Sequence, residues 1–107
     1  MLVNVVKQIR PNLNVEFFEP KTSPMVAPEV IEYMKQNYID NSRLLAIVKE
    51  LDQSRLQLTI STIWENRDAY SEFFYNDETI RTGILEVSEA YRAANNILVE
   101  VVSEEEF

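Results

Sequence analysis

The side chains able to do chemistry in this sequence are tyrosines, carboxylates, lysines, arginines and asparagines, because the chain has no histidine and no cysteine. Without imidazole, a Ser-His-Asp triad, a histidine general base and a histidine-bound metal are excluded. Without thiols, a cysteine nucleophile, a disulfide, a zinc–thiolate site and an iron–sulfur cluster are excluded as well. Any catalysis would use these remaining side chains or the reactivity of the ligand itself, and we predict no metal and no cofactor.

Tyrosine hydroxyls are the most numerous candidates for contacts with a small ligand. A tyrosine could donate to an aromatic or apolar ligand, and it equally suits the edge of a core with its polar tip in water. The chain has five of them: Tyr33, Tyr38, Tyr70, Tyr75 and Tyr91. The sequence leaves both interpretations open for each one.

The charged residues late in the chain are weaker candidates. Glu86 and Glu89 lie three residues apart, on the side of a predicted helix away from Ile84. This position favours a solvated face over a pair of catalytic carboxylates. Arg92 could pair with Glu89 or hold an anionic ligand, and pairing at the surface is the commoner arrangement.

The composition is typical of one soluble domain and disfavours several kinds of partner. The chain has 107 residues, of which 46% are hydrophobic, and its net charge is −8 from 18 acidic and 10 basic residues. The basic residues are scattered, so nucleic acid and anionic membrane surfaces are unfavourable partners. No apolar run approaches the roughly 18 residues that a membrane span needs, and residues 1–10 do not read as a signal peptide. We predict a cytoplasmic protein.

The first half of the chain predicts one strand and one helix around a long connection. Residues 2–9 are rich in Val and Ile, as strands are. All four prolines fall between positions 11 and 28, which predicts an irregular segment that Phe17 and Phe18 could pin to the body. Pro28 suits the first turn of a helix over 27–39.

The second half predicts a hairpin, two helices and a last strand. Residues 44–51 and 55–64 alternate as strands joined by a short turn at 52–54. Asn66 can cap a helix over 67–74, and the pair Asn76-Asp77 can cap a longer one over 78–94. Asn95 and Asn96 can supply the left-handed residue that ends a helix. We expect the final strand over 97–102 and a solvated acidic tail over 103–107. The longer helix carries an apolar stripe, formed by Ile80, Ile84, Val87, Tyr91 and Ala94.

This order of elements predicts a single ferredoxin-like domain over residues 1–107. The order is strand, helix, strand, strand, helix, strand, which is the split βαβ arrangement. Its expected architecture is a four-stranded antiparallel sheet with helices on one face.

Residues 55–77, RLQLTISTIWENRDAYSEFFYND, resemble the most characteristic stretch of the dimeric α+β barrel superfamily, the antibiotic-biosynthesis-monooxygenase-like proteins. In those proteins the third strand ends in a tryptophan, a polar pair follows, and the next helix carries an aromatic residue six positions after the tryptophan. The corresponding residues here are Trp64, Glu65, Asn66 and Tyr70. The superfamily includes oxygenases, isomerases, haem-degrading enzymes and regulatory domains. The resemblance therefore predicts the fold more specifically than the function.

The resemblance implies a homodimer in which two sheets pack face to face as an α+β barrel. Helices cover only one face of such a sheet, so the other face needs a partner. The strand over 44–51 agrees with this arrangement because it is apolar on both sides. Alternation places Leu45, Ile47 and Leu51 on one face, and it places Leu44, Ala46 and Val48 on the other.

Two positions test the haem-degrading branch of the superfamily. Its characteristic tryptophan and its haem-ligating histidine, nine and nineteen positions after the strand-end tryptophan, correspond to Phe73 and Gly83. Without the histidine the axial ligand is missing, so we do not expect haem degradation. Trp64 itself is expected to be a structural plug rather than an active residue, because large apolar side chains at core spacing belong to the core.

Gly83, the only glycine, lies inside a predicted helix, where glycine costs about 1 kcal/mol relative to alanine. Close packing of the helix on the sheet is the favoured explanation, and a small pocket left by the missing side chain is the alternative. In the relatives, ligands lie between helix and sheet. The candidate pocket residues on this basis are Trp64, Tyr70, Phe73, Gly83, Ile84, Tyr91 and Arg92.

Two functions follow as hypotheses. The first is a homodimeric small-molecule-binding or structural protein whose ligand, if present, is small and apolar or aromatic. The second, implied by the resemblance, is a cofactor-independent monooxygenase or isomerase acting on a small aromatic or enolisable substrate. Such an enzyme needs donors for developing negative charge, for which Asn4, Tyr70 and Arg92 are suitable types. A closed, fully packed interior would exclude the enzyme, whereas a cavity of about 300 Å³ or more with convergent polar groups would favour it.

Overall fold

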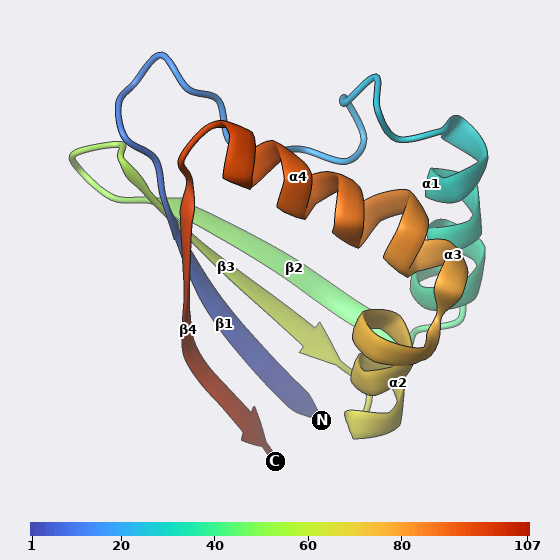
Figure 1. Ribbon diagram of the computed structural model, residues 1–107. Coiled ribbons are helices and arrows are strands. Elements are labelled where there is room, and N and C mark those ends of the chain that lie inside the picture. Colours follow the sequence, from blue (N-terminus) through green and yellow to red (C-terminus); the bar gives the residue numbers. More distant parts are fainter.

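The computed structural model describes residues 1–107 and contains one antiparallel sheet of four strands in the order β2-β3-β1-β4 (Figure 1). Its strands are β1 (Leu2–Ile9), β2 (Leu44–Leu51), β3 (Gln57–Trp64) and β4 (Leu98–Glu106). β1 lies inside the sheet and pairs with β3 on one side and β4 on the other. This is the ferredoxin-like βαββαβ arrangement that the sequence predicts.

The helices form a layer on one face of the sheet (Figure 1). α1 (Pro28–Met34) continues as a π-helical turn over Lys35–Ile39. α2 (Arg67–Ser71) is extended in the same way over Glu72–Asn76. α3 (Glu78–Ile80), a π-helical turn over Arg81–Leu85 and α4 (Glu86–Ala94) make one continuous rod. None of these helices is long and apolar enough to span a bilayer.

The helix boundaries follow from side-chain caps that the sequence indicates. The Asn66 carboxamide oxygen accepts from the Ala69 amide at 2.9 Å, and the Asp77 carboxyl accepts from the Ile80 amide at 3.2 Å. Each contact satisfies an amide that would otherwise lack a partner in the first helical turn. At the other end of the rod, Asn96 adopts a φ of 56° and reverses the chain into β4.

The proline-containing connection between β1 and α1 is held against α4 by aromatic contacts. The Phe18 ring lies 5.5 Å from that of Tyr91, whose hydroxyl donates to the Glu16 carbonyl at 2.6 Å. The Arg10 guanidinium lies 4.7 Å from the centre of the Phe17 ring. The two phenylalanines therefore pin this segment, as the sequence predicts.

The hydrophobic core occupies one end of the sheet rather than its whole helical face. It lies where β1 begins and β3 ends, under α1, α2 and α3. Eleven buried residues form it: Leu2, Val26, Met34, Tyr38, Leu44, Trp64, Ala69, Tyr70, Phe73, Ile80 and Ile84. The half of the sheet beneath α4 contains the buried polar residues Asn4 and Gln8, and α4 above it contributes the buried Ser88. Packing and polarity therefore divide the space between sheet and helices into two parts.

The faces of β2 differ from the expected alternation. A register shift between Leu44 and Ala46 inserts Leu45 as an extra residue. Such a bulge moves every following side chain to the other face. Leu44 therefore lies on the helical side together with Ile47, while Ala46 and Val48 lie on the uncovered side.

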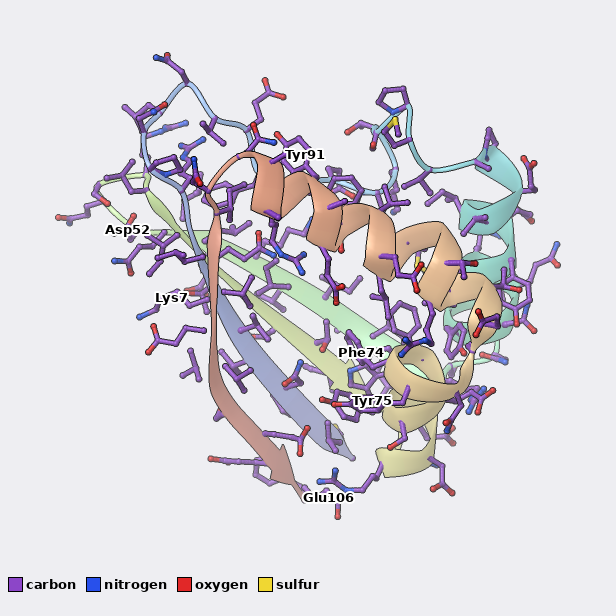
Figure 2. All side chains as sticks on the ribbon, viewed as in Figure 1. Lys7, Asp52, Phe74, Tyr75, Tyr91 and Glu106 are labelled. Atoms are coloured by element: carbon purple, nitrogen blue, oxygen red, sulfur yellow. The ribbon has the colours of Figure 1, made fainter.

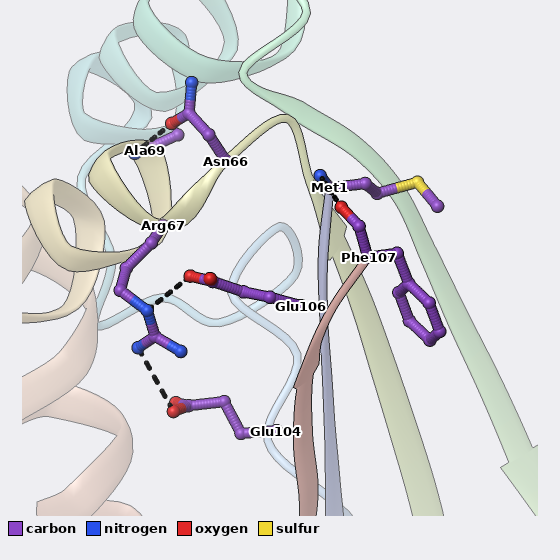
Figure 3. A network of polar contacts seen from close by, with 7 residues as sticks. All are labelled: Met1, Asn66, Arg67, Ala69, Glu104, Glu106 and Phe107. Carbon is purple, nitrogen blue, oxygen red and sulfur yellow. Dashed lines mark hydrogen bonds and ion pairs between the residues drawn. The ribbon is translucent and has the colours of Figure 1, made fainter.

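The acidic segment over 103–107 is not a free tail, because β4 runs to Glu106. Its end pairs with the beginning of β1, and the Phe107 amide donates to the Met1 carbonyl at 2.8 Å. Figure 3 shows Arg67 between Glu104 and Glu106, with Nη1 3.2 Å from the Glu104 carboxylate and Nε 2.5 Å from that of Glu106. Hydrogen bonding and charge pairing order a segment whose composition alone suggests solvation.

Candidate functional site

Two sides of the α3–α4 rod face different surroundings. Ile80 and Ile84 point into the core. One position further along, Arg81, Leu85, Ser88 and Arg92 follow one another at helical spacing and face the sheet below α4. The polar members of this second stripe prevent the tight apolar packing seen at the other end of the molecule.

A cavity of about 400 Å³ lies between this stripe and the sheet. Its volume is within the range of small-molecule pockets and exceeds the value of about 300 Å³ above which the enzyme hypothesis is favoured. Strands supply its floor and the rod its roof, and Phe74 closes one end. Its lining residues are Asn4, Val6, Gln8, Ile60, Thr62, Phe74, Tyr75, Arg81, Leu85, Ser88, Glu89, Arg92 and Val99.

The floor is polar where a sheet under a helix is usually apolar. Asn4 and Gln8 alternate with Val6 on the helical face of β1, and their side chains are 94% and 91% buried. The Gln8 carboxamide oxygen Oε1 has no hydrogen-bond partner in the chain. A buried acceptor without a partner costs about 1–3 kcal/mol, so the floor contains an acceptor that a bound molecule could satisfy.

The roof carries a partly buried positive charge. Arg92 Nη1 donates to Ser88 Oγ at 3.1 Å, and Ser88 Oγ donates to the Leu85 carbonyl at 2.8 Å. No carboxylate lies within 4.0 Å of the Arg92 guanidinium, since the four ion pairs of the chain involve other residues. Burial lowers the pKa of Arg92, and the nearby Glu89 charge opposes this shift.

The aromatic end of the cavity rests on the core. In Figure 2, Phe74 and Tyr75 lie between the helical layer and the sheet. The Phe74 ring packs against Trp64 with ring centres 5.7 Å apart, and against Tyr70 at 5.0 Å. Tyr75 is 62% exposed and Val99 46%, so these two residues mark the mouth of the cavity.

Arg92 is the one sequence-predicted pocket residue that lines this cavity. Four others lie in the core, namely Trp64, Tyr70, Phe73 and Ile84. Trp64 is 1% exposed and its indole Nε1 donates to Thr62 Oγ1 at 2.9 Å, which agrees with its expected role as a plug. Burial raises the pKa of Tyr70, and its contacts with Glu104 and Tyr75 raise it further. Tyr91 lies on the outer side of α4 against Glu16 and Phe18.

Gly83 marks a close contact between helices rather than between helix and sheet. A Cβ atom at this position would lie 2.7 Å from Val30 Cγ1 and 2.9 Å from Val30 Cγ2 of α1. The Val30 methyl groups therefore fill the space that a side chain at position 83 would occupy, and no pocket opens there. Close packing was the favoured explanation from sequence, and its partner is α1 instead of the sheet.

The cavity residues that are absent from the predicted pocket do have a signal in the sequence, and one of them, Asn4, is predicted only as a suitable donor type. Asn4 and Gln8 share the face of β1 that carries the buried Leu2, a position where polar residues are uncommon. On the rod, Arg81, Ser88 and Arg92 repeat at helical spacing next to the apolar stripe. Two polar stripes that face each other across a sheet–helix interface indicate a cavity, provided that the pairing of the elements is known.

A second buried polar cluster lies within the core and serves packing. The hydroxyls of Tyr38 and Tyr33 donate to Asp77 Oδ2 at 2.6 and 2.8 Å, and Oδ1 caps α3. Burial and the Asp77 contact raise the pKa of Tyr38. The Asp77 carboxylate thus accepts from three donors. It links α1 and the π-helical turn that follows it to α3, and it offers little room for a ligand. No group of three or more His, Cys, Asp or Glu side chains is arranged to hold a metal ion.

Neither a protein-family model nor a curated protein matches the sequence. Two solved structures share the fold over nearly the whole chain. A proposed antibiotic biosynthesis monooxygenase from Deinococcus radiodurans is 11% identical with a TM-score of 0.58, covering 100% of this chain and 92% of that one. A dimeric ferredoxin-like protein from an uncultured marine organism is 12% identical with a TM-score of 0.59, covering 99% and 96%. The chain therefore has the ferredoxin-like α+β fold of these two structures.

Proposed function

We propose that this protein is a homodimer that binds a small molecule in the cavity between α4 and the sheet. The observation that carries the proposal is the combination of a cavity of about 400 Å³ with polar groups from both walls. Burying Asn4, Gln8 and part of Arg92 beside an empty space costs free energy. A ligand that hydrogen-bonds these groups recovers that cost, whereas a purely structural protein would gain stability by replacing them with apolar residues.

The second half of the proposal concerns the uncovered face of the sheet. Neighbouring side chains from three strands form an apolar centre there, and charged residues such as Lys7 and Glu50 lie beside it. The centre consists of Val3, Val5, Ala46, Val48 and Ile63. An apolar centre with a polar rim is typical of protein interfaces, and the marine ferredoxin-like structure is dimeric. A second copy of this chain is therefore the proposed occupant.

Catalysis is a second candidate, and it rests on the donors that share the cavity. Arg92 and Asn4 could both stabilise negative charge developing on an enolisable or phenolic ligand. Glu89 is the one carboxylate of the lining and would serve as the base. A cofactor-independent monooxygenase would consume oxygen together with the bound ligand, whereas a binding protein would release the ligand unchanged. Oxygen uptake by the ligand-loaded protein separates these two functions.

A thermal-shift comparison of two α4 variants tests binding in the cavity. Ser88→Phe fills the roof, and the matched control Ala90→Phe adds the same ring at an exposed position. The compounds are mandelate, methyl mandelate, naphthol and naphthoate. Because a ligand stabilises only the state that binds it, at least one compound should raise the Tm of the native chain and of Ala90→Phe, but not of Ser88→Phe. Equal shifts in both variants, or no shift with any compound, would reject the proposal.

A further inference from the structure

The floor and the roof of the cavity carry hydrogen-bonding groups of opposite kind, an acceptor on the floor and a donor on the roof. Gln8 pairs with Val99 near the beginning of β4. Arg92 belongs to the end of α4 that leads into β4, since the Ile97 amide donates to the Arg92 carbonyl at 3.0 Å, and Arg92 lines the same cavity as Gln8. The floor at this end offers an unpaired acceptor, and the roof offers a guanidinium without a carboxylate partner. A ligand that satisfies both must carry a donor and an anionic acceptor close together.

The charge of the lining limits the charge of the ligand. Two arginines and one glutamate line the cavity, which leaves a net charge of +1 in a chain whose net charge is −8. A monoanion neutralises this local charge. A dianion such as a phosphate monoester would bring surplus negative charge next to Glu89, and like charges at short range are unfavourable. A planar carboxylate also matches the fork of the guanidinium donors.

The rest of the lining sets the character of the remaining ligand atoms. Val6, Ile60 and Leu85 give the cavity an apolar middle, and Phe74 closes its far end with an aromatic ring. An apolar or aromatic body would therefore lie between the polar end and Phe74. The mouth at Val99 and Tyr75 allows such a body to enter from the β4 edge.

We infer that the cavity binds a small monocarboxylic acid with an apolar body, whose carboxylate contacts Arg92 and whose neighbouring hydroxyl or N–H donates to Gln8 Oε1. This inference rests on the proposed function, because it names the ligand class of the same cavity. Ser88 prepares the site by fixing one guanidinium nitrogen of Arg92. The remaining guanidinium donors are available to the carboxylate.

Three probes that differ by one group test this inference by isothermal titration on the native chain. Mandelate has an aromatic body, a carboxylate and a neighbouring hydroxyl; methyl mandelate lacks the charge and phenylacetate lacks the hydroxyl. Losing the charge-assisted contact should weaken binding about tenfold or more, and losing the neutral hydrogen bond about fivefold. These comparisons need no variant, so a substitution that fails to fold does not affect them.

Variants then assign each preference to its residue. Arg92→Gln should abolish the preference for mandelate over methyl mandelate, and Gln8→Met the preference for mandelate over phenylacetate. Arg67→Gln, a surface arginine outside the cavity, should change neither preference. Equal binding of mandelate and its ester, or tighter binding of the ester, overturns the inference. If methyl mandelate binds at least as tightly as mandelate and Ser88→Phe removes that binding, the proposed function stands while the ligand class is wrong. If none of the three probes binds and the thermal-shift series is also negative, both fail.

Discussion

Replacing Gly83 with alanine sets two free-energy terms of opposite sign against each other. Alanine in a helix interior is favoured over glycine by about 1 kcal/mol. The new Cβ would, however, lie 2.7 Å from Val30 Cγ1 and 2.9 Å from Val30 Cγ2. Valine in a helix has one strongly preferred χ1 rotamer, so it cannot rotate away cheaply. Overpacking of this kind costs about 1–3 kcal/mol, and we expect Gly83→Ala to destabilise the fold by about 1 kcal/mol.

A double-mutant cycle with Val30→Ala separates the two terms. Without the valine methyls the clash disappears and the helix propensity remains, so Gly83→Ala should stabilise the Val30→Ala background by about 1 kcal/mol. The predicted coupling between the two sites is therefore about 2 kcal/mol. Both alanines stay within their helices, so the cycle changes packing without changing the helix boundaries.

Urea unfolding followed by tryptophan fluorescence measures each corner of the cycle. Trp64 is the only tryptophan and is 1% exposed, so its emission reports loss of the core. All four proteins must be compared at one concentration, because the stability of a dimer depends on it. A native-background Gly83→Ala that is more stable than the parent, or a coupling near zero, would refute close packing between α1 and the rod.

Three further predictions follow from other contacts. Tyr38→Phe should lower the free energy of unfolding by about 1–2 kcal/mol at neutral pH, because the hydrogen bond to Asp77 is lost. The raised pKa of Tyr38 favours its neutral form in the folded state, so the native chain should lose stability as the pH rises above about 10. The variant should lose less, and urea unfolding at several pH values measures the difference. Arg67→Gln should speed amide hydrogen exchange at the end of β4 while leaving global unfolding nearly unchanged, because its ion pairs are exposed; unaltered exchange would contradict the pairing. Val48→Glu should convert the proposed dimer to monomer in sedimentation velocity, since it places a charge in the apolar centre of the uncovered face.

Local signals predict the order of the elements because each has a local cause. Alternating apolar residues predict β1 and β3, the cap at Asn66 predicts α2, and the left-handed Asn96 predicts the end of α4. The prolines likewise predict the irregular connection over residues 10–27. These features depend on neighbours within a few positions, so a single sequence contains them.

Where a feature depends on residues far away in the sequence, the prediction from sequence was wrong or was not made. The end of β4 is ordered by β1 and by Arg67, more than 35 positions away from Glu104, so its composition indicated a tail. The bulge at Leu45 reverses the faces of β2, and simple alternation cannot show it. The cavity requires knowing that Gln8 and Arg92 face each other across two layers. Arg92 was predicted as a pocket residue because an arginine suggests anion binding by its residue type alone, without knowledge of the side chains around it.

Native mass spectrometry of gently purified protein tests the central claim most directly, because it reports assembly and bound ligand together. The account predicts a species of twice the 12.5-kDa chain that carries a small organic adduct or acquires one on incubation with mandelate. A monomer would contradict the proposed interface on the uncovered sheet face. A dimer whose mass stays unchanged with mandelate, methyl mandelate, phenylacetate, naphthol and naphthoate would contradict small-molecule binding in the cavity beneath α4.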